Sequence, residues 1–129
     1  MGKQLTSFQF ELPEYTSKSY DWRKAILKRA REAACNRAVT VPFNDHSEFE
    51  LTIVLPDLPN HDVDNLLKHV MDALQGHLTG TGKKLRHKDH ILPNDKMVRR
   101  VIIEKSCGHF TLGWVKVGKY SSKRRKLNL

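Results

Sequence analysis

Two carboxylates and a lysine lie close together near the middle of the sequence. Asp62 and Asp64 are two residues apart, and Lys68 follows Asp64 by four residues. Hard divalent cations such as Mg²⁺ take oxygen ligands, commonly one or two carboxylates together with water and a substrate phosphate. On a helix, Lys68 would share a stripe with Asp64, where it could hold a phosphate or stabilise charge on a leaving oxygen. The segment is therefore a candidate site for metal-assisted phosphodiester hydrolysis.

The same three side chains also have a purely structural interpretation. Aspartate is a preferred N-cap residue, so either Asp62 or Asp64 could cap the helix that begins here. Asp64 and Lys68 could form an ordinary surface ion pair, which is worth only about 0.3–0.5 kcal/mol. Spacing alone leaves both interpretations open.

A third carboxylate, Asp95, favours the chemical interpretation. Asp95 comes just before a predicted strand that starts near Met97, and we expect a mixed sheet to bring it beside the start of the helix at 62–74. Three carboxylates and a lysine at one edge are costly to hold together unless a cation or a phosphate balances them. Asp72, two helical turns after Asp64, is expected to have a structural or supporting role.

The elements that must position these residues follow from the hydrophobic periodicity. Alternation predicts strands at 8–12 and 49–55, and apolar stripes predict helices at 20–36 and 62–74. Two further strands are expected at 97–105 and 109–117, joined through Ser106, Cys107 and Gly108 by a hairpin turn. The order strand, helix, strand, helix, strand, strand predicts an α+β fold, with one small mixed sheet of about four strands packed with two helices. At 129 residues the chain is expected to form a single domain, 1–129.

Some side chains are assigned to solvent or to the core on the same grounds. Arg23 is placed on the wet face of the first helix with the other basic residues. His61, His69 and His77 recur every eight residues, which fits no zinc site and no single helical face, so we expect them to be exposed. Trp22 and Trp114 are expected in the core or at an interface.

Basic residues gather in two segments that lack apolar periodicity. One is a long loop at about 75–94, and the other is a tail at about 119–129. Their cationic side chains are either phosphate contacts or solvated charge, and the candidates are Lys83, Lys84, Arg86, Lys123, Arg124 and Arg125. The whole chain carries 23 Lys and Arg against 14 Asp and Glu, a net charge of +9, which suits a polyanionic partner such as nucleic acid.

Composition excludes several other classes of protein. Hydrophobic residues make up 39% and charged residues 29%, which are values of a folded globular chain and not of a disordered one. The sequence has no apolar run long enough to cross a membrane and no signal-peptide pattern at its start, so we expect a cytoplasmic protein. Cys35 and Cys107 are too few for a disulfide framework and are expected to be free thiols.

Taken together, these motifs resemble the RusA family of Holliday junction resolvases. The likeness rests on Asp62-x-Asp64-Asn65-x-x-Lys68-x-x-x-Asp72-Ala73-Leu74, followed by Asn94-Asp95-x-x-Val98 and a strand that ends in Glu104-Lys105. It covers about residues 51–105. The resemblance implies a RusA-like nuclease domain that acts as a homodimer, requires Mg²⁺ or Mn²⁺, binds four-way DNA junctions and nicks opposing strands symmetrically in recombination and repair.

The resemblance also implies a role for each matching residue. Asp62, Asp64 and Asp95 would be metal ligands, and Lys68 would face the phosphate. Asn65 would orient its neighbours. Two other functions stay open from the residues alone: a DNA-binding module without catalysis, and a nuclease that acts on another branched nucleic acid.

Overall fold

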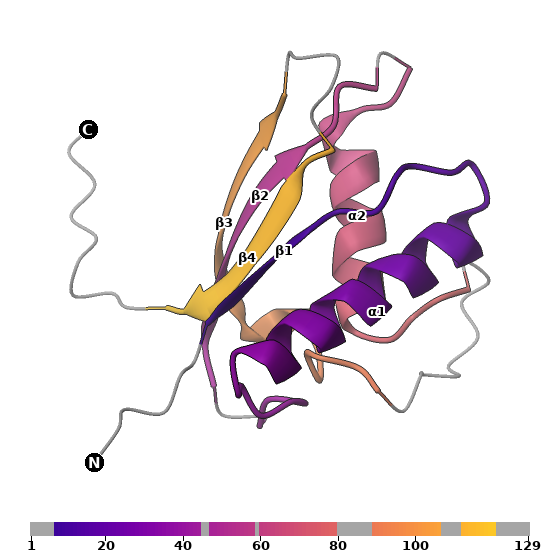
Figure 1. Cartoon of the computed structure of the whole chain (residues 1–129). Coiled ribbons are helices and arrows are strands. Elements are labelled where there is room, and N and C mark those ends of the chain that lie inside the picture. Colours follow the sequence, from indigo (N-terminus) through magenta and orange to yellow (C-terminus); the bar gives the residue numbers. More distant parts are fainter. Residues whose placement is uncertain (1–6, 45–46, 59, 80–88, 107–111, 121–129) are drawn as a thin grey trace, which may run out of the picture.

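A four-stranded sheet with two helices on one face forms the body of the protein (Figure 1). The computed structural model describes residues 7–44, 47–58, 60–79, 89–106 and 112–120. In chain order the elements are β1 (Phe8–Glu11), α1 (Ser19–Asn36), β2 (Phe49–Leu55), α2 (Val63–Leu74), the 3-10 helix η1 (Asp95–Met97), β3 (Val98–Lys105) and β4 (Trp114–Lys119). The predicted α+β class, element order and number of strands are therefore confirmed.

The strands lie in the order β1-β4-β2-β3. β4 is antiparallel to both of its neighbours, whereas β2 and β3 are parallel. A parallel pair needs a crossover connection, and α2 provides it between β2 and β3. The sheet is thus mixed, as predicted.

The predicted hairpin between the last two strands is wrong. β2 lies between β3 and β4, so these consecutive strands are not hydrogen-bonded to each other. The physical reason is that β2 is the most apolar strand, with every second residue from Phe49 to Leu55 buried, and it takes the central position with a partner on each side. Residues 107–111, which include the expected turn residues Cys107 and Gly108, lie outside the described ranges.

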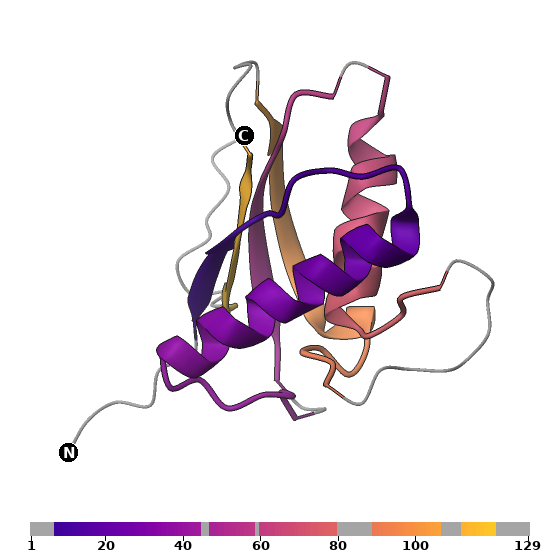
Figure 2. The same cartoon turned by 45° about the vertical axis from the view of Figure 1, so that its right-hand side comes forward.

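The core lies between the sheet and the helices (Figure 2). β2 places Leu51 and Ile53 on its buried face, and β4 adds Val115 and Val117. α1 contributes Trp22, whose indole N–H donates to the carbonyl oxygen of Pro13 at 3.1 Å. α2 packs through Leu66, Val70, Ala73 and Leu74. Burying a large aliphatic or aromatic side chain contributes about 1.5–3 kcal/mol, so this layer fixes how α2 lies on the sheet.

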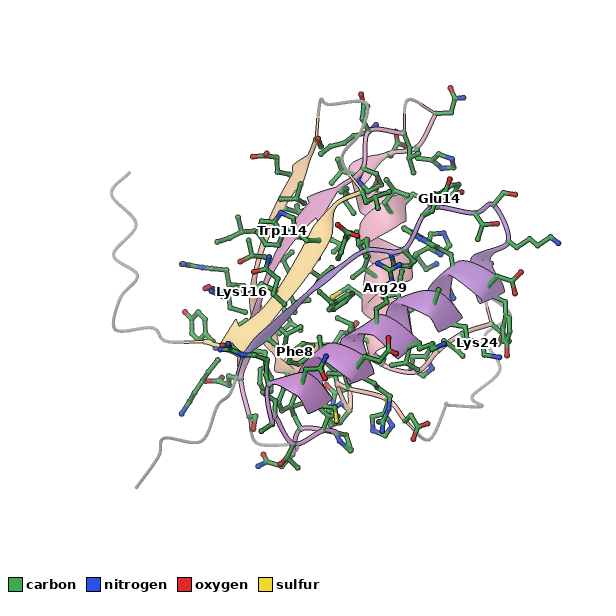
Figure 3. All side chains as sticks on the ribbon, viewed as in Figure 1. Phe8, Glu14, Lys24, Arg29, Trp114 and Lys116 are labelled. Carbon is green, nitrogen blue, oxygen red and sulfur yellow. The ribbon has the colours of Figure 1, made fainter. Side chains whose placement is uncertain are left out.

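The other face of the sheet carries no helix in the described part of the chain. Figure 3 shows Trp114 and Lys116 on β4 pointing away from the helices, while Phe8 points into the core. Trp114 is therefore half-buried on the open face, whereas Trp22 is a core residue. None of the described helices is long and apolar enough to span a membrane.

Several boundaries differ from the sequence prediction. Met97 belongs to η1, so β3 begins one residue later than expected. The strand predicted at 109–117 is β4, and the described residues Leu112 and Gly113 precede it. β4 runs to Lys119, so the predicted tail at about 119–129 overlaps the sheet by one residue. The amide of Tyr120 donates to the carbonyl oxygen of Glu48 at 3.0 Å. A long loop is predicted at 75–94, and residues 75–79 and 89–94 of it are described. These residues contain no helix or strand, as expected.

Candidate active site at the start of α2

The loop before α2 is fastened to the end of the neighbouring strand. Lys105, the last residue of β3, donates through Nζ to the carbonyl oxygens of Leu58 at 2.8 Å and His61 at 2.9 Å. The amide of His61 also donates to the carbonyl oxygen of Leu58 at 3.0 Å. The imidazole of His61 packs against Tyr15, with ring centroids 4.7 Å apart. These contacts hold the chain just ahead of Asp62 against the sheet.

Asp62 is the N-cap residue of α2, but its side chain does not cap the helix. Its backbone is extended, and its carbonyl oxygen accepts the first helical hydrogen bond, from the amide of Leu66 at 3.1 Å. The carboxylate is exposed and makes no capping hydrogen bond. The structural interpretation of this acid, that its carboxylate is needed as a cap, is therefore not realised.

Asp64 and Lys68 are exposed on α2, away from the buried residues Leu66 and Val70. One carboxylate oxygen of Asp64 accepts from the amide of Asn65 at 3.0 Å, which fixes its rotamer within the first helical turn. Among the ion pairs of the described residues, none joins Asp64 to Lys68. Their charges are thus available to a ligand.

Asp95 does not lie with these residues. It is in η1, immediately before β3, whereas Lys105 at the other end of β3 touches the loop before α2. Eight strand residues at roughly 3.3 Å each separate the two ends by more than 20 Å. The amides of Ile91 and Leu92 donate to the carbonyl oxygen of Leu74, so the segment that leads to Asp95 lies at the C-terminal end of α2.

The expected convergence of three acids within one chain is therefore wrong. Because α2 is a crossover between two parallel strands, its start lies at the end of β3 and its end lies at the start of β3. Asp95 precedes β3, so it is separated from Asp62 and Asp64 by the length of the helix. Figure 1 shows the start of β3 at the C-terminal end of α2. Asn94 has a local role here, since its side-chain oxygen caps η1 by accepting from the amide of Lys96 at 2.8 Å. Within the described ranges no group of three or more His, Cys, Asp or Glu residues is arranged to hold a metal.

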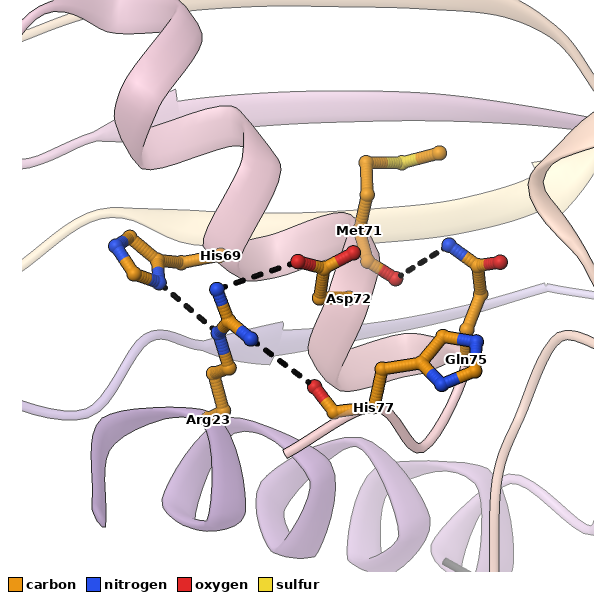
Figure 4. Close-up of polar contacts among 6 residues, drawn as sticks. All are labelled: Arg23, His69, Met71, Asp72, Gln75 and His77. Carbon is orange, nitrogen blue, oxygen red and sulfur yellow. Dashed lines mark hydrogen bonds and ion pairs between the residues drawn. The ribbon is translucent and has the colours of Figure 1, made fainter. Parts of the chain in front are cut away.

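Asp72 has a structural partner, as expected. It pairs with Arg23 of α1, with 3.2 Å between the carboxylate Oδ2 and Nη2 of the guanidinium (Figure 4). Arg23 also donates through Nε to Nδ1 of His69 at 3.0 Å and through Nη1 to the carbonyl oxygen of His77 at 3.3 Å. One guanidinium thus joins α1 to α2 and to the segment that follows α2.

The predicted exposure of Arg23 is wrong, because this residue is 4% exposed. A signal was present in the sequence: Arg23, Leu27, Ala30 and Ala34 continue one helical stripe, and the last three are buried core residues. The three histidines are also half-buried and not exposed as predicted. His69 packs against Trp22 with ring centroids 5.7 Å apart, and a period of eight residues does not reveal such contacts.

The surroundings of His69 lower its pKa below the usual value of 6.5. Burial is the main cause, because it disfavours the charged imidazolium, and the guanidinium of Arg23 acts in the same direction. Nδ1 accepts a hydrogen bond from Arg23, which the protonated ring could not do. His69 is therefore a neutral member of this network.

A groove beside α1 also has charged walls. It is lined by Lys24, Leu27, Lys28, Arg31, Glu32 and Asp89. Arg31 is bound to Asp89 by an ion pair of 3.7 Å, and Glu32 adds a further negative charge. The groove therefore has three basic side chains, Lys24, Lys28 and Arg31, against two acidic ones, Glu32 and Asp89. The proposed DNA contacts Lys83, Lys84, Arg86, Lys123, Arg124 and Arg125 lie outside the described residues.

Comparison with known proteins adds no assignment. No protein-family model matches the chain, and no curated protein matches it.

Proposed function

We propose that the protein is a divalent-metal-dependent endonuclease that acts on branched DNA, with Asp62, Asp64 and Lys68 at its centre. The observation that carries this proposal is the exposure of two carboxylates and an ammonium group on the first two turns of α2. The carboxylate of Asp62 makes no capping hydrogen bond, and no ion pair of the described residues joins Asp64 to Lys68. The likeness of the motif to RusA-type resolvases supplies the substrate class, a four-way DNA junction.

The donor set fits Mg²⁺ or Mn²⁺. Asp62 and Asp64 offer carboxylate oxygens, the ligand type that these hard cations prefer, and such cations commonly keep water and substrate phosphate in their remaining positions. When bound, the ion would polarise the scissile phosphate and activate water. Lys68, one turn further along α2, would attract the phosphate and stabilise the negative charge that develops on it. Asn65 holds the carboxylate of Asp64 through its backbone amide.

The electrostatic setting supports a polyanionic substrate. The net charge of +9 favours association with nucleic acid through release of counterions from the phosphates. The N-terminus of a helix also attracts negative charge, because its first amides point outward. Asp62 and Asp64 reduce this attraction, and a bound cation would restore it. A cytoplasmic homodimer is part of the same proposal.

The decisive experiment is cleavage of a labelled synthetic four-way junction with Mg²⁺ by the wild-type protein and by Asp64→Asn. Asp21→Asn is a matched control, because Asp21 is an exposed acid in the first turn of the other helix. We expect paired nicks in opposing strands from the wild type and from Asp21→Asn, and none from Asp64→Asn. Binding of the junction should persist in all three proteins.

Two other outcomes would replace the proposal. Tight junction binding without cleavage by the wild type, in Mg²⁺ and in Mn²⁺, would indicate a DNA-binding module. Cleavage of flaps or forks in preference to the four-way junction, at one salt concentration, would keep the nuclease and change its substrate.

A further inference from the structure

α1 carries a row of basic side chains with an aromatic ring at one end. Tyr20, Lys24, Lys28 and Arg31 follow one another at intervals of three or four residues, so they share one side of the helix, and we call them the basic stripe. Tyr20 is 45% exposed although its ring is large, and both lysines are exposed. At a rise of about 1.5 Å per residue, the basic stripe is about 16 Å long.

The groove beside α1 gives the basic stripe a wall on its other side. Lys24, Lys28 and Arg31 line this groove together with Leu27, a core residue that supplies an apolar surface between them. Arg31 is occupied by the opposite wall. Its Nη1 donates to the carbonyl oxygen of Asp89 at 3.1 Å and lies 3.7 Å from the carboxylate of the same residue. The charge of Asp89 is therefore matched by Arg31.

Lys24 and Lys28 supply the remaining positive charge of the groove. Neither takes part in an ion pair among the described residues. Nζ of Lys24 lies 5.9 Å from the centroid of the Tyr20 ring, so the ammonium group and the ring are next to each other. Glu32 is the acid of the groove that is not paired with Arg31. A ligand there meets two ammonium groups against one carboxylate, which favours an anion.

We propose that the basic stripe binds a single-stranded segment of nucleic acid, with a base stacked on Tyr20 and phosphates at Lys24 and Lys28. Proteins that hold single strands combine a cationic groove that follows the backbone with aromatic rings on which bases stack. In a duplex the base faces are covered by their neighbours, so the ring of Tyr20 has no partner there. The net charge of +9 strengthens the attraction of the backbone.

The Tyr20 end of the basic stripe lies toward the first half of α2. Trp22, two residues after Tyr20, packs edge-on against His69 of α2, with ring centroids 5.7 Å apart. His69 directly follows Lys68. A strand held along α1 therefore leads toward the candidate site. This guiding role rests on the proposed function, whereas binding of the strand does not.

Binding is tested by fluorescence anisotropy with a labelled oligothymidylate at several salt concentrations, in EDTA so that no cleavage occurs. Lys28→Gln should weaken binding and reduce the steepness of log K against log salt by about 0.7, the value for one phosphate contact on a single strand. Arg29→Gln is the matched control, because this neighbouring cation is paired with Glu11 of β1, and it should bind like the wild type. Glu32→Gln should bind more tightly than the wild type, by about twofold or more.

The role of the ring is tested with the same oligothymidylate. Tyr20→Leu should weaken binding about fivefold or more without changing the salt dependence, whereas Tyr20→Phe keeps the ring and should stay within about twofold of the wild type. A duplex of the same length should bind equally to the wild type and to Tyr20→Leu. Circular dichroism checks that each variant is folded.

Two results would overturn the basic stripe as a binding surface: a wild type that does not bind the oligothymidylate, and the same salt dependence in Lys28→Gln and Arg29→Gln. Equal losses in Tyr20→Leu and Tyr20→Phe would overturn the stacked base. A loss in Tyr20→Leu that is as large for the duplex would overturn the single strand as the partner. If Tyr20→Leu does not fold, the comparison of Lys28→Gln with Arg29→Gln decides the question without it.

The guiding role is tested separately by cleavage of the four-way junction in Mg²⁺. Lys28→Gln should raise KM and leave kcat unchanged, because it removes binding that is equal in the ground state and the transition state. An unchanged KM would overturn the guiding role alone. A wild type that binds the oligothymidylate but cleaves nothing would overturn the proposed function and the guiding role, and would leave the binding surface in place.

Discussion

Arg23 of α1 and Asp72 of α2 form an ion pair of 3.2 Å that joins the two helices beneath their surface. The Arg23 side chain is 5% exposed, and two of its N–H groups donate to Nδ1 of His69 and to the carbonyl oxygen of His77. A buried cation is costly unless it is paired and hydrogen-bonded, and here both conditions are met. The pair therefore fixes how α1 crosses α2.

Replacing Arg23 with methionine should destabilise the fold by about 1–3 kcal/mol, because Asp72 and the acceptors at His69 and His77 lose their donor. Arg29→Met is the matched control. Arg29 pairs with Glu11 at 3.6 Å, but these side chains are 43% and 63% exposed, so its loss should cost no more than about 0.5 kcal/mol. Urea denaturation of the three proteins measures both values. Equal losses in the two variants would contradict the importance of burial at Arg23.

His69 makes stability depend on pH. Its pKa is lowered in the folded state, so below the usual value of 6.5 the unfolded chain binds more protons than the folded one at this residue. The contribution of neutral His69 to folding stability is complete above pH 6.5. It is lost as the pH falls from 6.5 toward the lowered pKa of the folded state. In His69→Asn, an amide oxygen can accept from Arg23 without titrating.

The melting temperature of the wild type should therefore fall more steeply on acidification below pH 6.5 than that of His69→Asn. Melting curves at several pH values between 7 and 5 measure the difference in slope, which removes the contribution of the other histidines. Parallel slopes would show that His69 titrates alike in both states.

Neutralising the acids at the start of α2 should leave the fold intact. The carboxylate of Asp62 makes no capping hydrogen bond, and an asparagine at position 64 keeps an oxygen for the amide of Asn65. We expect Asp62→Asn and Asp64→Asn to lose at most about 1 kcal/mol of stability, through the helix dipole alone. The rise in melting temperature on addition of Mn²⁺ should disappear in both variants. A large loss of stability in either variant would show that the replaced carboxylate is needed for the fold, which contradicts the prediction.

Lys105 should order the loop that precedes α2. Lys105→Met removes two hydrogen bonds from a charged donor, at 2.8 and 2.9 Å, and should cost about 1–3 kcal/mol. Lys119→Met on the exposed end of β4 is the control and should be neutral. Hydrogen exchange at the amide of His61, which is bonded to Leu58, reports the local effect. Protection there should fall in Lys105→Met and stay unchanged in Lys119→Met.

The fold could be predicted from the sequence because its signals are local. The alternation of apolar residues predicts both ends of β2 correctly, and the apolar stripe of Leu66, Val70 and Leu74 predicts the ends of α2 to within one residue. The pairing of the strands could not be predicted in the same way. Whether β4 pairs with β3 or with β2 depends on which of the two strands buries more apolar surface at the centre of the sheet. The pattern of residues within one strand does not contain that information.

The candidate site shows the same division. Asp62, Asp64 and Lys68 follow from a motif within a single helix, and the structure leaves all three exposed at its start. The position of Asp95 depends on which end of α2 lies beside the start of β3. That is set by the crossover connection between the parallel strands β2 and β3, and no single segment of the sequence predicts it. Arg23 was assigned to solvent by its charge, although its helical position placed it on the core stripe.

The two hydrogen bonds of Lys105 have a thermodynamic meaning beyond local order. They connect the end of the edge strand to the backbone that carries Asp62. A contact that orders either of these two segments therefore lowers the entropic cost of ordering the other. Such coupling is reciprocal, so a ligand that ordered the backbone of Asp62 would by the same factor favour the ordered state of the end of β3. A single ammonium group thereby connects the end of the edge strand to the start of α2.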